Sequence, residues 1–132
     1  MVTREILFRG KRIDNGEWVE GYYVKAEKLD HSGDEHFIIE YAADGKTYEV
    51  IPETVGQYTG RIDKNGKKVF EDDVVRIFYG QLDDDICKVV YSRGTLVGVL
   101  SDGVLDSLPR RKEKLEVIGN IHDNPELLEV SK

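Results

Sequence analysis

The sequence of 132 residues predicts an all-β protein, and three observations lead to that prediction. Short runs rich in β-branched and aromatic residues recur at roughly ten-residue spacing, as in small barrels and sandwiches. Turn-forming Gly, Asn and Asp residues separate these runs. The one good helix start lies near the C-terminus, where Asn124 can cap and Pro125 can take the first helical position, so a short C-terminal helix is expected.

The first half of the chain predicts an antiparallel β-meander. Its expected strands cover residues 5–12, 17–24, 35–41 and 46–51. The first two form a hairpin around Asp14-Asn15-Gly16. Gly21 interrupts the second strand, which indicates either a bulge or a close backbone approach. Alternation with period two places Tyr48 and Val50 on one face of the fourth strand.

The second half predicts a second β unit, a small barrel or sandwich. Residues 52–55 favour one helical turn, and Asp63-Lys64-Asn65-Gly66 is the strongest hairpin signal in the chain. Further strands are expected at 74–79, 86–91, 95–100 and 115–121, with an acidic loop at 83–85 and turns at Gly80 and 93–94. The change of pattern near residues 52–56 divides the chain into units of residues 1–53 and 54–132.

Composition limits the function classes. Charged residues make up 34% of the chain, the formal net charge is -7 and the sequence pI is about 5.0, so the chain as a whole repels phosphate backbones. The apolar runs are too short for a membrane span, and the N-terminus lacks the layout of a secretion signal. Cys87 is the one cysteine and cannot form an internal disulfide. These features predict a cytoplasmic protein with no membrane partner.

Possible catalytic and metal-binding residues have simpler structural interpretations. Asp83-Asp84-Asp85 offers hard oxygen ligands for a cation, but an acidic loop is the alternative. Glu71-Asp72-Asp73 offers paired carboxylates, but a turn with positive φ at Asp72 is the alternative. His31, His36 and His122 match no zinc-ligand spacing with Cys87, which is expected to be buried and inert. The sequence therefore predicts no catalytic residue, no metal site and no cofactor.

Two features point to binding. The basic cluster Arg110, Arg111, Lys112 and Lys114 is a possible nucleic-acid contact, and a solvated connector is the alternative interpretation. The chain also has seven tyrosines, a residue type suited to interfaces, and pairing with another subunit is one way to protect exposed strand edges.

Three separated blocks resemble the YopX family of phage and prophage proteins. They are residues 8–23, residues 50–60 followed by 63–67, and residues 115–128. The resemblance implies phage or prophage origin, a C-terminal small barrel of the Src-homology-3 type, self-association and no enzymatic activity. It implies no catalytic residue. The family's usual Glu-Gly-Asp is replaced here by Glu71-Asp72-Asp73.

Two functions remain as hypotheses. The leading one is a non-enzymatic phage accessory protein that acts as a homo-oligomeric protein-binding module with an unidentified protein partner. The alternative is a nucleic-acid-associated small-barrel protein that uses the basic cluster at residues 110–114.

Overall fold

The computed structural model describes residues 6–42, 44–92, 95–100, 103 and 105–128. Its strands are antiparallel and follow the hydrogen-bonded orders β4-β3-β2-β1-β5-β6 and β10-β9-β8-β7-β11. The chain divides into two compact units, Met1–Tyr58 and Thr59–Lys132, with the division inside β5. The all-β prediction is confirmed, and the helical elements are short 3₁₀ turns.

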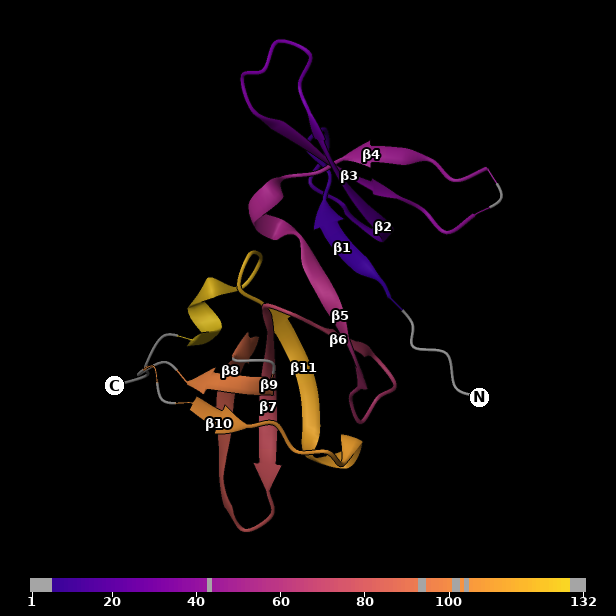
Figure 1. Cartoon of the computed structure of the whole chain (residues 1–132). Helices are drawn as coiled ribbons and strands as arrows, with labels where there is room; N and C mark the ends of the chain where they lie inside the picture. The colour runs from indigo at the N-terminus through magenta and orange to yellow at the C-terminus, as the bar shows by residue number, and fades with distance from the viewer. Residues whose placement is uncertain (1–5, 43, 93–94, 101–102, 104, 129–132) are drawn as a thin grey trace. The chain divides into compact units, whose positions relative to one another are not determined.

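Unit 1 contains four strands, a 3₁₀ turn and the start of a fifth strand (Figure 1). These are β1 (Phe8–Lys11), β2 (Trp18–Glu27), β3 (Asp34–Ile39), β4 (Thr47–Glu49), η1 (Pro52–Thr54) and the first residues of β5 (Gly56–Ile62). The predicted hairpin between the first two strands is present, and Gly16 in its turn has a φ of 73°. The meander prediction is therefore confirmed in its strand order, although β2 is longer than expected.

Gly21 marks a close backbone approach. The pairing of β1 with β2 runs without a register shift from Phe8 opposite Gly21 to Lys11 opposite Trp18, so the bulge expected as one alternative is wrong. A Cβ atom on Gly21 would lie 2.0 Å from the carbonyl oxygen of Ile39. The other alternative is correct, because only glycine lets β2 and β3 come this close.

Backbone hydrogen bonds also link the end of β1 to the residues around β4. Arg12 and Val50 form an isolated antiparallel bridge, and the Ile51 amide donates to the Lys11 carbonyl over 2.8 Å. Val50 is buried with Ile38 in the core of unit 1. Tyr48 is half-buried on the same face, so the alternation predicted for this strand is confirmed.

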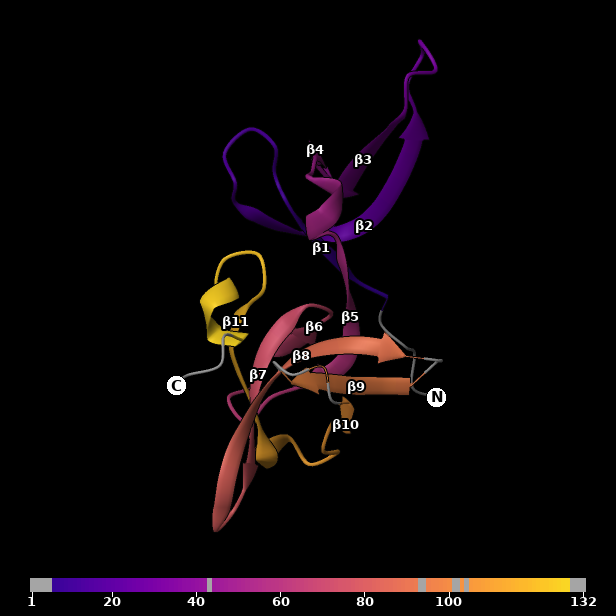
Figure 2. The same ribbon diagram turned by 90° about the vertical axis from the view of Figure 1, so that its left-hand side faces the viewer.

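Unit 2 contains the rest of β5 and a five-stranded sheet. Its elements are β6 (Lys68–Phe70), β7 (Asp73–Tyr79), β8 (Leu82–Ser92), β9 (Thr95–Leu100), β10 (Leu105–Ser107), η2 (Lys112–Lys114), β11 (Leu115–Asn120) and η3 (Pro125–Leu128). The sequence did not predict β10. The predicted turn at 93–94 lies outside the described residues. Figure 2 shows β8 and β9 side by side as long strands.

The acidic loop expected at residues 83–85 is wrong, because these residues belong to β8. Asp85 lies opposite Ile77 in β7, and its carboxylate accepts a hydrogen bond from the Tyr79 hydroxyl over 3.0 Å. The turn at Gly80 is present as predicted, with a φ of 76°. Pairing with a regular partner strand thus extends β8 through residues of low strand propensity.

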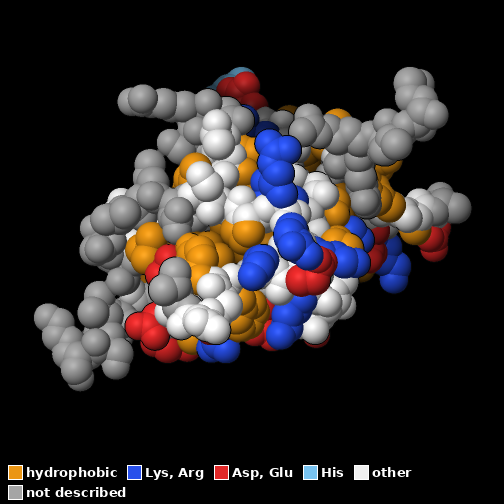
Figure 3. Space-filling model, turned by 90° about the horizontal axis from the view of Figure 1, so that it is seen from below, with side chains coloured by type: hydrophobic (Ala, Val, Ile, Leu, Met, Phe, Trp, Pro, Cys, Tyr) orange, Lys and Arg blue, Asp and Glu red, His pale blue; other side chains and the backbone are white. Residues whose placement is uncertain are grey.

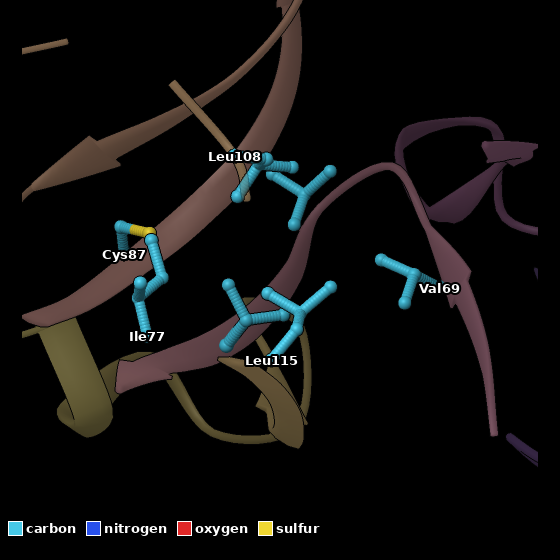
Figure 4. Close-up of a cluster of buried hydrophobic side chains, with 7 residues drawn as sticks. Val69, Ile77, Cys87, Leu108 and Leu115 are labelled. Atoms are coloured by element: carbon cyan, nitrogen blue, oxygen red, sulfur yellow. The ribbon is translucent and has the colours of Figure 1, made fainter. Parts of the chain in front are cut away.

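One face of the five-stranded sheet carries the core of unit 2. Val75, Ile77, Cys87 and Val89 project from β7 and β8 and pack with Val69, Leu108 and Leu115 (Figure 4). Cys87 is fully buried, as the sequence predicts. Among the described residues, β10 and β11 are the two ends of an open ladder. The closed barrel expected for this unit is therefore not confirmed, and the predicted C-terminal helix is the single 3₁₀ turn η3.

Candidate functional site

The ribbon formed by β2 and β3 carries apolar side chains on both of its faces. Tyr22 pairs with Ile39 and Val24 pairs with Phe37, so these four side chains share one face. Ile38, on the opposite face, is fully buried in the core of unit 1. We call the first set, together with the neighbouring Tyr41, the aromatic face. Its members are Tyr22, Val24, Phe37, Ile39 and Tyr41.

The aromatic face is largely open to solvent. Tyr22 is 58% exposed, Tyr41 43% and Val24 39%, while Phe37 and Ile39 are half-buried. The rings of Tyr22 and Tyr41 meet edge to face with centroids 4.1 Å apart, and the Tyr41 hydroxyl donates to the Ile6 carbonyl. An open hollow of about 490 Å³ is lined by Tyr22, Ile39, Glu40, Tyr41, Ala42 and Gly45. Such a hollow can accept an apolar side chain of a partner.

One edge of β2 continues this surface. β1 begins at Phe8, opposite Gly21, and the next six residues of β2, Tyr22–Glu27, pair with β3 on the other side. Within the described part of the chain, no strand is paired to the outer edge of Tyr22–Glu27. An unpaired edge beside an apolar face is a template for adding a strand from another chain.

Polar contacts support the ribbon from its other face. The Tyr23 hydroxyl and the Nδ1 atom of His36 are 2.5 Å apart, and the two rings stack with centroids 5.9 Å apart. His31 lies at the exposed tip of the ribbon, where its Nδ1 atom is 2.7 Å from Glu27. His122 lies in unit 2, 3.7 Å from Asp72. The three histidines thus serve separate local contacts.

Two of the acidic residues weighed as catalytic make structural contacts. Asp73 is buried, and its Oδ2 atom accepts from the Phe70 amide over 2.7 Å. Asp72 has a φ of 69°, as predicted, and its amide donates to the Val89 carbonyl. Successive residues of a strand point to opposite faces, so Asp83-Asp84-Asp85 cannot converge on one cation. The described residues contain no group of three His, Cys, Asp or Glu placed to hold a metal.

Asp63 is a buried acidic residue that sequence reasoning missed. Its Oδ1 atom accepts from the amides of Asn65 and Lys67, and its Oδ2 atom accepts from the amide of Val117, each over 2.9 Å. Burial raises the pKa of this carboxyl group, but the three amides outweigh burial and hold the pKa below its usual value. The sequence signal that could have identified it is its place at the start of the Asn65-Gly66 turn, because Asp side chains at such positions accept hydrogen bonds from nearby backbone amides.

The basic cluster lies in unit 2 just before and within η2. Arg110, Arg111 and Lys112 are exposed, and Lys114 is half-buried. These positions suit a solvated connector and also suit contact with an anion. No helix in the described residues is long and apolar enough to cross a membrane.

The described residues form an all-β protein of two antiparallel units. The family model described as YopX protein matches residues 7–129. The chain therefore belongs to the YopX family. No curated protein matches it.

Two solved structures have the same fold. Protein EF1440 from Enterococcus faecalis is 21% identical, with a TM-score of 0.54, and the match covers 96% of this chain and 100% of that one. Protein yopX from Bacillus subtilis is 19% identical, with a TM-score of 0.55, and the match covers 96% and 98% of the two chains. Neither name states an activity.

Proposed function

We propose that this chain is a non-enzymatic phage or prophage accessory protein that acts in the host cytoplasm, associates with itself and binds a protein partner through the aromatic face. The observation that carries the proposal is that the β2–β3 ribbon exposes the aromatic face on the side away from the buried Ile38. An antiparallel sheet that covers a core with one face normally presents polar side chains on the other. A contiguous exposed apolar surface, beside a strand edge that no described residue covers, instead favours protein association.

A second copy of the chain suits the edge of β2. If two copies pair antiparallel about Val24, each Val24 lies opposite the other, Tyr22 lies opposite Ala26, and Tyr23 lies opposite Lys25. No two like charges then face each other, and Tyr22, Val24 and Ala26 of both copies form one continuous apolar stripe. The contact is the same on both copies, which is the usual arrangement in a two-fold dimer. The hollow beside Tyr41 stays available for a different partner.

Sedimentation velocity over a range of protein concentrations tests self-association. We expect the wild type to shift reversibly from monomer to dimer. The Val24→Arg variant places a charge at the centre of the stripe and should remain a monomer. Ile13→Arg is the matched control, because Ile13 is 54% exposed in the same unit but lies outside the aromatic face.

A wild type that stays monomeric at every concentration overturns the self-association part of the proposal. Equal loss of association in Val24→Arg and Ile13→Arg shows that added charge, rather than the aromatic face, controls the equilibrium. The partner-binding part is tested separately, by affinity capture from phage-induced cells with wild type and with Tyr41→Ser as bait. A protein recovered equally by both baits does not use the hollow.

A further inference from the structure

Unit 2 brings together two segments that carry basic residues and are far apart in the sequence. The amide of Lys64, in the turn between β5 and β6, donates to the carbonyl of Leu115 over 2.9 Å. Leu115 directly follows the basic cluster. Arg61 in β5 donates from one terminal nitrogen to the carbonyl of Leu108 over 3.3 Å and to that of Pro109 over 2.7 Å. These bonds hold the start and the end of the segment at residues 108–115 against the β5–β6 hairpin.

The resulting basic patch consists of Lys64, Arg110, Arg111, Lys112 and Lys114. Lys and Arg side chains form a band on the face of the molecule seen in Figure 3. Glu113 is the one acidic residue within the cluster, and its carboxylate is 3.7 Å from Arg111. Asp63 in the neighbouring turn is fully buried and accepts three backbone amides. The patch is therefore a local concentration of positive charge in a chain of net charge -7.

We propose that the basic patch binds the phosphodiester backbone of nucleic acid without regard to sequence. Two arginines offer planar guanidinium groups that match phosphate oxygens, and three lysines add positive charge. The ammonium group of Lys64 lies 4.8 Å from the centroid of the Phe78 ring. The cluster lies on a turn and a connector, so its side chains can follow a backbone but do not form an element that enters a groove. The acidic remainder of the chain repels phosphates and so directs the contact to this patch. This activity is separate from protein binding by the aromatic face.

Fluorescence anisotropy with a labelled duplex of about 20 base pairs, and with its single strand, tests the proposal on the full chain. Five phosphate contacts predict a slope of about -4.5 for the logarithm of the duplex-binding constant against the logarithm of salt concentration. That slope corresponds to a loss of roughly 500-fold in affinity between about 50 mM and about 200 mM salt. Either strand form offers the same phosphate chemistry, and the comparison shows which one the patch prefers.

Two double variants separate local charge from net charge. Arg111→Gln with Lys112→Gln removes two exposed members of the patch, and the slope should fall in magnitude to about 2.7. Lys28→Gln with Lys46→Gln removes two exposed lysines of unit 1 and should leave the slope unchanged. Circular dichroism checks that both variants are folded. No nucleic-acid binding at about 50 mM salt, equal weakening by both double variants, or binding of polyglutamate in place of nucleic acid each overturns the proposal.

Discussion

A single carboxylate, that of Asp63, joins the β5–β6 hairpin to β11. Two of its hydrogen bonds close the hairpin turn, and the third reaches the Val117 amide 54 positions along the chain. Because Asp63 is fully buried, no water replaces a lost partner easily. The same residue therefore sets a local turn and a long-range strand contact.

Replacement of Asp63 by Asn should lower the free energy of unfolding by about 2 kcal/mol at pH 7, because the amide group of Asn cannot accept from Val117 while its oxygen bonds Asn65 and Lys67. Urea unfolding followed by circular dichroism measures the change. Asp30→Asn is the control, since Asp30 is an exposed carboxylate that also accepts a turn amide. An equal loss of stability in the control would contradict the role given to Asp63.

Asp63 also makes stability depend on pH. Its pKa in the folded state is lower than in the unfolded state, so the unfolded state binds the proton more readily. The stabilisation is complete above the unfolded pKa of about 3.9 and is lost as pH falls through the folded pKa. The stability difference between wild type and Asp63→Asn should therefore shrink as pH falls below about 4. Urea titrations at several acid pH values test this, and a difference that grows toward low pH contradicts it.

Asp72 holds a left-handed backbone conformation at the entry to β7. Its φ of 69° lies in the left-handed region that favours glycine. We expect Asp72→Gly to be neutral or to stabilise by up to about 1 kcal/mol, because relief of backbone strain exceeds the added freedom of the unfolded chain. Thermal unfolding measures the change. A clear fall in melting temperature would show that the contact between Asp72 and His122 matters more than the backbone.

At the scale of elements, the pairing of β2 with β3 builds the aromatic face. Gly21 lets the two strands meet where the ribbon leaves β1, and the continuous register then assigns alternate residues to the two faces. A change in this register of one residue would turn the aromatic face toward the core of unit 1.

Gly21→Ala should destabilise unit 1 by roughly 3 kcal/mol, because the new Cβ atom meets the Ile39 carbonyl, which belongs to the backbone and cannot rotate away. Gly16→Ala is the comparison. A Cβ atom there meets nothing within 4 Å, so the change there adds backbone strain alone, at a φ of 73°. Hydrogen exchange of the β2 and β3 amides locates the loss. Equal protection in both variants would contradict the close-approach argument.

Period-two patterns and turn residues predicted most strands, because these signals are local. The Asn65-Gly66 hairpin and the alternation around Val50 are examples. Asp83-Asp84-Asp85 was wrongly predicted to form a loop, since its strand conformation comes from pairing with β7 rather than from residue propensity. The open ladder of unit 2 and the joining of Lys64 to the basic cluster depend on contacts between distant segments, which the local pattern of a single sequence does not display. The aromatic face had a signal in Phe37, Ile38 and Ile39, which are apolar on both faces of one strand.

At the scale of the whole molecule, charge and apolar surface act against each other. The net charge of -7 makes copies of the chain repel one another at neutral pH and so opposes the self-association proposed for the aromatic face. Near the sequence pI of about 5.0 the repulsion vanishes.

Turbidity should therefore pass through a maximum near pH 5 in the wild type, in line with the pI of about 5.0. Val24→Arg should show a weaker maximum, because it interrupts the apolar stripe. Light scattering between pH 4 and pH 8, with Ile13→Arg as the control of equal charge, measures the effect. A maximum of the same height in both variants would mean that the aromatic face does not drive association at this pH.

The division of the chain between Tyr58 and Thr59 has a consequence for synthesis on the ribosome. Each unit is one uninterrupted stretch of sequence, so unit 1 can fold while unit 2 is still being translated. Unit 2 cannot complete its fold until Val117 has left the exit tunnel, because the Val117 amide donates the third hydrogen bond to the Asp63 carboxylate. During that interval the nascent chain carries a completed ribbon with its aromatic face exposed. Neighbouring ribosomes on one message would then place two such ribbons close together, so the self-association proposed above could begin before either chain is finished.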